Sequence, residues 1–108
     1  MDFTLSDKYY FLKELLKYDI KNNDDLIKIV LISNKINDLI DQRINTVIFF
    51  NVKELIINLS ACLHFEKVEE ELIINKLELE KDINYLDVIS LHKEYLNTIK
   101  EVIIKYNL

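Results

Sequence analysis

Hydrophobic residues recur every three or four positions through most of the chain, which is the pattern of amphipathic helices. The spacing predicts a first helix over about residues 5–18, and residues 4–7 read Thr-Leu-Ser-Asp, the form of a capping box. A polar break over residues 21–24 precedes a second helix, expected over about residues 25–44. Residues 26–32 are almost all apolar, so we expect the first half of that helix to be central and buried.

The middle of the chain contains one possible strand, residues 46–50, whose side chains are β-branched or aromatic. No second strand is available to pair with it, so we interpret this stretch as the frayed end of the second helix. A third helix is expected to begin at Val52, after a cap at Asn51. No stop signal follows until about Asp82, so one long helix and two helices bent near His64 both remain open.

The last predicted helix has the clearest pattern, from residue 84 or 85 to residue 106. It carries one apolar stripe suited to packing in a bundle and a second stripe beside the first. The second stripe consists of Val88, Leu91, Tyr95 and Val102. Because one stripe suffices for packing in a bundle, we expect the second to be available to a partner.

Composition narrows the fold further, because the chain of 108 residues has no Gly and no Pro. Tight two-residue hairpins rely on Gly and phosphate loops require it, so the first are disfavoured and the second are excluded. The sequence therefore predicts an all-α fold, a small bundle of four or five helices in one domain over residues 1–108. The abundance of Ile, Lys and Asn is typical of a low-GC genome.

Charge and cysteine content restrict the partners and the compartment. The net charge is −5 and the chain has a single Arg, Arg43, so we expect no direct binding to nucleic acid. No apolar run approaches the roughly 20 residues that span a membrane, and the first residues lack the features of a signal peptide. A lone cysteine, Cys62, forms no internal disulfide. These features predict a cytoplasmic protein, in the source cell or in an infected host.

No residue pattern indicates catalysis, a metal or a cofactor, so we predict that the protein is not an enzyme. His64 and His92 fit no zinc pattern, and His92 lies in an apolar stripe, where a structural histidine with a hydrogen-bond partner is expected. Cys62 lies among small residues suited to close helix packing. Residues 64–67, His-Phe-Glu-Lys, are similar to the His-x-x-Lys core of histidine phosphotransfer modules. Those modules continue with a small residue, whereas this chain has three carboxylates at residues 69–71.

Residues 66–82 include seven acidic residues and three lysines. This segment therefore accounts for −4 of the net charge of −5. Such a segment is either a solvated helix face or a docking surface that selects basic partners. Aromatic residues beside the main stripe of the first helix are typical of interface anchors. The predicted partner-binding residues are Glu66, Glu69, Glu70, Glu71, Glu78, Tyr10, Phe11, Leu91 and Tyr95.

These features favour a protein-binding module without catalytic activity, which inhibits or escorts a macromolecular partner. Immunity proteins, antitoxins, viral antagonists and secretion chaperones are of this type. The alternative is a homo-oligomeric structural module whose last helix pairs with its own copy. A histidine-phosphotransfer-like domain is a minor alternative.

Overall fold

The computed structural model describes residues 5–19, 21–40, 52–80 and 86–108, and these residues form an all-α bundle of four helices without a strand. This architecture confirms the predicted fold class. The described helices are α1 (Leu5–Leu15), α2 (Asn23–Ile40), α3 (Val52–Glu80) and α4 (Leu86–Tyr106).

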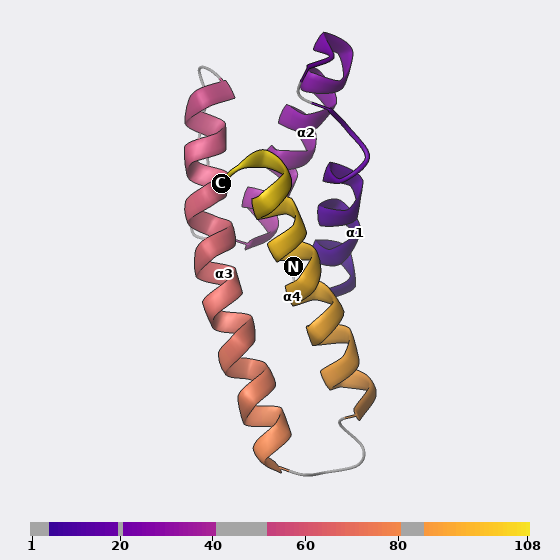
Figure 1. The fold of residues 1–108 in the computed structure, drawn as a ribbon, viewed down its shortest axis with the longest axis vertical. Coiled ribbons are helices and arrows are strands. Elements are labelled where there is room, and N and C mark those ends of the chain that lie inside the picture. The colour runs from indigo at the N-terminus through magenta and orange to yellow at the C-terminus, as the bar shows by residue number, and fades with distance from the viewer. Residues whose placement is uncertain (1–4, 20, 41–51, 81–85) are drawn as a thin grey trace.

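The four helices pack in a closed cycle (Figure 1). α1 packs against α2 and α4, and α3 packs against the same two helices. The side chains that meet in the middle are mostly aliphatic, with two tyrosines from α4. They are Leu12, Leu15, Ile29, Ile36, Leu59, Leu63, Tyr95, Ile99, Val102 and Tyr106. Burial of this apolar surface is the main force that holds the helices together.

α3 is a single helix of 29 residues, which settles the question left open by the sequence. At about 1.5 Å per residue it is roughly 43 Å long, close to the whole 47 Å length of the molecule. α3 and α4 are the two longest helices, and α3 forms the left edge of the bundle in Figure 1. A long helix at an edge presents a long outward face.

Hydrogen bonds hold both the start of α2 and the end of α1, and α1 is shorter than the sequence predicted. Asn22 caps α2 as expected, because its side-chain oxygen accepts a hydrogen bond from the amide of Asp24 at 3.0 Å. α1 ends at Leu15 rather than at Tyr18. Its last carbonyls are bound by α4: the Tyr106 hydroxyl donates to the Leu15 oxygen at 2.5 Å and to the Tyr18 oxygen at 3.2 Å. Burial raises the pKa of Tyr106 to about 12, so its hydroxyl remains a donor at neutral pH.

The expectation of a fully buried first half for the second helix is wrong. Ile29 is buried, but Ile27 and Leu31 are both 63% exposed. α2 therefore packs through one face, as an amphipathic helix does, even where its sequence is apolar on all sides. The predicted caps at Thr4 and Asn51, the stretch 46–50 and the end of the second helix beyond Ile40 lie outside the described residues.

Candidate interaction surface on helix α3

The outward face of α3 is apolar along most of its length. Phe65, Leu72 and Leu79 are 68%, 65% and 79% exposed, and the residues between them on the same face are also exposed. We call this face the outer stripe, which consists of Ile57, Ala61, Phe65, Val68, Leu72 and Leu79, with Asn75 as its one polar member. In an α-helix these seven positions fall within an arc of about 80°.

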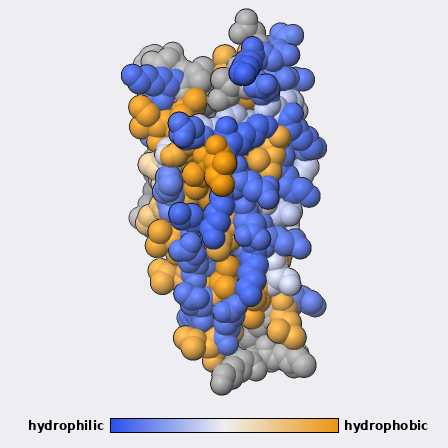
Figure 2. All heavy atoms as spheres, viewed as in Figure 1, coloured by the Kyte–Doolittle hydropathy of each residue, from blue (hydrophilic) through white to orange (hydrophobic). Residues whose placement is uncertain are grey.

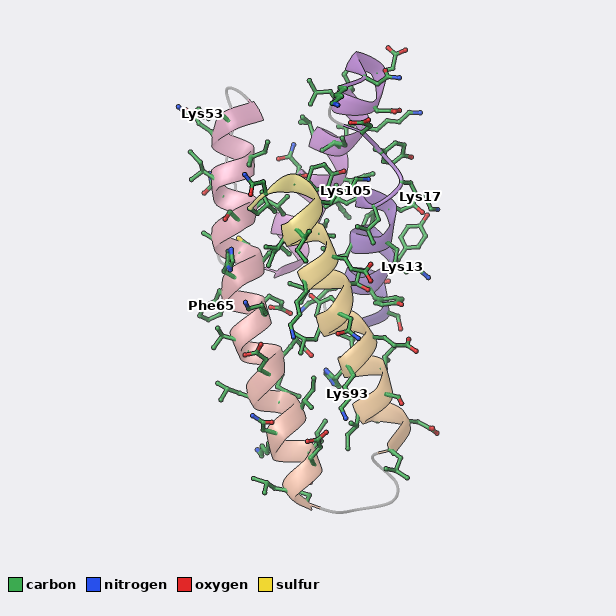
Figure 3. All side chains as sticks on the ribbon, in the orientation of Figure 1. Lys13, Lys17, Lys53, Phe65, Lys93 and Lys105 are labelled. Atoms are coloured by element: carbon green, nitrogen blue, oxygen red, sulfur yellow. The ribbon has the colours of Figure 1, made fainter. Side chains whose placement is uncertain are left out.

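Figures 2 and 3 show the molecule in the same orientation as Figure 1, with the outward face of α3 in profile along the left edge. Apolar side chains follow the left edge of the molecule in Figure 2, where α3 lies. Phe65 projects away from the other helices in Figure 3. A continuous apolar face of this kind is uncommon on a protein that works alone, since it leaves hydrophobic area in water.

The outward face of α4 provides an internal comparison. Its exposed residues are mostly polar, as is usual for the solvent side of a bundle helix, and include Ser90, Lys93, Asn97 and Lys100. The exposed apolar residues of α4 are Leu86, Val88 and Ile104, at 59%, 41% and 78% exposed, and they do not form a continuous stripe. The apolar outward face is therefore a property of α3 and not of every helix in the bundle.

The inward face of α3, which packs against the bundle, contains two glutamates. Glu66 and Glu70 are only 3% and 4% exposed, and they are flanked by the buried Leu63 and Ile74. Between residues 65 and 72, α3 thus buries carboxylates and exposes large apolar side chains. Burying carboxylates is costly unless they have partners, and both of these glutamates have them.

Glu66 is bound by two other helices. The Lys8 ammonium on α1 donates to Glu66 Oε1 at 3.2 Å, and the Tyr95 hydroxyl on α4 donates to the same oxygen at 3.1 Å. Burial and the neighbouring carboxylate of Glu66 raise the pKa of Tyr95 well above its usual value, so its hydroxyl stays protonated and donates. One carboxylate therefore joins α1, α3 and α4.

Glu70, which lies one turn after Glu66 on α3, pairs with a histidine of α4. Its Oε2 lies 2.5 Å from Nδ1 of His92 on α4, and both side chains are largely buried. This contact confirms the expectation that His92 is a structural histidine with a partner. We call Lys8, Glu66, Glu70, His92 and Tyr95 the inner polar cluster.

The inner polar cluster fixes the rotation of α3 about its own axis. Turning α3 by half a turn would bury Phe65 and Leu72 and release Glu66 and Glu70 to water, at the cost of exposing the core residues on the inward face, which include Leu59, Leu63 and Ile74. That turn would also break the contacts of Glu66 with Lys8 and Tyr95 and that of Glu70 with His92. Buried ion pairs usually contribute little net stability but can specify one arrangement over another. Here the arrangement they specify keeps the outer stripe outside.

The prediction that five glutamates form an acidic docking surface is wrong for two of them, Glu66 and Glu70. Glu66 and Glu70 point into the bundle, so they cannot contact a partner in this structure. Glu69 and Glu78 are exposed and Glu71 is half-buried, and all three flank the outer stripe. Glu78 also pairs with Lys93 of α4 at 2.7 Å.

Two of the four residues of the predicted second stripe, Tyr95 and Val102, lie in the core, whereas Val88 is 41% exposed. Tyr95 has no exposed surface and Val102 is also fully buried, because α4 packs on α1 as well as on α3 and so uses both stripes. Leu91 is half-buried. On α1, Tyr10 is exposed and contacts Phe11 edge to face at 5.4 Å between ring centres, while Phe11 packs against the core.

Sequence reasoning missed the outer stripe, although its signal was present. Phe65, Val68 and Leu72 are spaced by three and four residues, but glutamates stand between them in the sequence and the whole stretch was interpreted by its charge. Two of those glutamates lie inside with distant partners: Glu66 with Lys8, 58 residues away in the sequence, and Glu70 with His92, 22 residues away. No local pattern contains that information.

Other kinds of site find little support in the described residues. No three His, Cys, Asp or Glu side chains there gather closely enough to hold a metal ion. None of the helices described combines the length and apolar character needed to cross a membrane. His64 is exposed, and its Nε2 lies 3.3 Å from the carbonyl oxygen of Leu108.

Comparison with known proteins adds no relative. No known protein family matches the sequence, and no curated protein or solved structure matches it. The geometry of α3 is therefore the basis on which a function can be assigned.

The buried Glu70 predicts a specific pH dependence of stability. Its pKa is raised above the ordinary value of 4.5, chiefly by burial and also by Glu66, while His92 and Lys8 lower it. A carboxyl with a raised folded pKa binds protons more readily in the folded chain than in the unfolded one. Its contribution to stability is therefore fully present below the unfolded pKa and is lost as the pH rises through the folded pKa.

The variant Glu70→Gln should lack this part of the pH profile, because its amide does not ionise. The free energy of unfolding in urea, measured between about pH 4 and pH 8, should fall with rising pH less steeply in the variant than in the original chain. Glu69→Gln is the matched control, since Glu69 is exposed on the same helix. Parallel profiles for Glu70→Gln and the original chain would contradict the prediction.

Proposed function

We propose that the protein is a binding module without catalytic activity, and that the outer stripe of α3 is the surface through which it binds another protein chain. The observation that carries the proposal is the inversion of α3. Two of its carboxylates, those of Glu66 and Glu70, are held inside by specific partners, while the apolar side chains of the outer stripe face water. An arrangement that exposes apolar surface in this way is understandable if a partner covers that surface.

The chemistry of the outer stripe suits a protein partner. Phe65 near its centre is the kind of aromatic anchor that contributes strongly to interfaces, and aliphatic residues, Ala61, Val68 and Leu72, flank it on the stripe. Charged residues, Glu69, Glu71, Lys76 and Glu78, border the stripe on both sides. An apolar centre with a charged rim is the usual anatomy of a protein interface, in which the rim selects the partner and its orientation.

Binding rather than catalysis is favoured by the state of the ionisable groups. The groups that the fold brings together in the interior, those of the inner polar cluster, are paired with one another and largely shielded from solvent. Their evident role is to orient α3. Inhibitors, escort proteins and self-assembling modules all act through surfaces of the kind that α3 presents.

The single cysteine of the chain, Cys62, is consistent with the cytoplasm as the compartment in which the protein acts.

A photo-crosslinking amino acid at Leu79 tests the proposal in the native cell. Leu79 lies at the exposed end of the outer stripe, so a probe there should form a covalent adduct with a protein chain. Asn97 on the polar outward face of α4 is the matched control position and should give no adduct. No adduct at Leu79, or equal adducts at both positions, would refute the outer stripe as a binding surface.

A further inference from the structure

We infer that the chain covering the outer stripe is a second copy of this protein, with the two α3 helices side by side, parallel and in register. The inference rests on the proposed function and names its partner. Three features of α3 support a second copy: the spacing of the stripe, the charges beside it and the position of the rest of the bundle.

The spacing of the outer stripe is that of a two-stranded coiled coil. From Ala61 the intervals to Phe65, Val68, Leu72, Asn75 and Leu79 are four, three, four, three and four residues. This is the alternation of the a and d positions of a heptad, which pack knobs into holes against the same positions of a partner helix. Such a seam is complementary to a copy of itself.

The charges beside the stripe match in a parallel pair. In that arrangement a g position of one helix faces the e position five residues further along the other helix. With Phe65 at a, the g residue Glu71 faces Lys76 of the second copy, and the g residue His64 faces Glu69. Two-fold symmetry makes each of these contacts twice. Glu71 with Lys76 is an attraction of opposite charges, and His64 with Glu69 sets no like charges against each other.

An antiparallel pair that overlaps the whole stripe is less compatible. Its two-fold axis would pass near Glu70, so Glu69 would face Glu69 and Glu71 would face Glu71. It would also set Asn75 against Phe65, whereas the parallel pair sets Asn75 against Asn75, where the two amides can bond each other. A single polar residue in a coiled-coil seam is a known means of fixing register.

The bundle leaves room for the second copy. The inward face of α3, with Leu63, Glu66 and Glu70, lies directly opposite the outer stripe, and α2 and α4 pack on α3 from the inward side. In a two-fold pair each bundle would therefore extend away from the seam (Figure 1). The inner polar cluster then has a role in assembly, because it holds the seam toward the partner.

Analytical ultracentrifugation of the purified chain tests the association. The original chain should sediment as a dimer, and Leu72→Glu should raise the dissociation constant at least about 100-fold, because it places a carboxylate in the seam. Ile104→Glu is the matched control: it makes the same kind of change at a 78% exposed apolar residue of α4 and should leave the dimer intact. Circular dichroism should show that both variants remain helical, since neither residue is in the core.

Disulfide trapping tests the orientation. With Cys62→Ser removing the native thiol, Asn75→Cys should form an intermolecular disulfide on mild oxidation, since the two copies of residue 75 meet only in the parallel register. In the overlapping antiparallel pair they would be roughly 15 Å apart, too far to bond. A dimer without this crosslink would overturn the parallel register.

The outcomes separate the two proposals. A purified chain that stays monomeric at about 100 µM would overturn the second copy as partner. So would a chain that dissociates equally with Leu72→Glu and with Ile104→Glu. If the adduct at Leu79 then contained a different protein, the proposed function would stand without self-association. If no adduct formed at Leu79, both would fall.

Discussion

Replacing Tyr95 with Glu is expected to unfold the protein, at a cost above about 4 kcal/mol. Tyr95 has no exposed surface, and its hydroxyl donates to Glu66. The substitution would remove the largest fully buried side chain and place a third carboxylate beside Glu66 and Glu70. A buried charge without a partner and a cavity are each among the most destabilising changes known. Loss of the helical circular dichroism signal in the absence of denaturant would show this effect.

Two substitutions calibrate that result. Tyr95→Phe keeps the ring and removes only the hydrogen bond to Glu66, so it should cost about 1 to 3 kcal/mol in urea unfolding. Ser90→Glu adds a carboxylate at an exposed position of the same helix and should have little effect. If Tyr95→Glu remained folded and lost only its partner, the sequence-based interpretation of the second α4 stripe as a free surface would be correct after all.

The sequence was sufficient for the fold because helices are local. The spacing of apolar residues by three and four positions and the polar break before Asp24 are local features of the sequence. Together with the absence of Gly, they led to the correct architecture. The same reasoning erred where burial depends on packing. Ile27 and Leu31 look like core residues in the sequence, but α2 packs against α1 and α3 through another face and leaves these two side chains exposed.

The candidate site was harder to predict because its determinants are long-range. Whether a glutamate on α3 faces in or out is decided by Lys8 on α1 and by Tyr95 and His92 on α4. A sequence pattern shows that Glu66 and Phe65 lie on different faces of a helix, but not which face packs inward. The acidic character of the segment was visible in the sequence, whereas the burial of Glu66 and Glu70, which leaves the outer stripe exposed, was not.

Removing the Lys8 ammonium is expected to destabilise the protein by about 3 kcal/mol. In Lys8→Met the carboxylate of Glu66 stays buried and keeps only the Tyr95 hydroxyl as a partner. Because Lys8 is itself partly exposed, water can compensate for some of the loss, and the cost should lie at the lower end of the range for broken buried pairs. Urea unfolding at neutral pH measures it. Lys67→Met on the same acidic segment is the control and should change stability little.

A triple variant, Lys8→Met with Glu66→Leu and Tyr95→Phe, separates stability from orientation. It replaces the ion pair and its hydrogen bond with apolar side chains, so its free energy of unfolding should return to within about 1 kcal/mol of the original. If the inner polar cluster orients α3, the triple variant should nevertheless dimerise more weakly, because the contact between Glu70 and His92 would be the one polar contact of the cluster that still opposes rotation of the helix. A triple variant that is as unstable as Lys8→Met but dimerises normally would show that the cluster stabilises the bundle without directing the outer stripe.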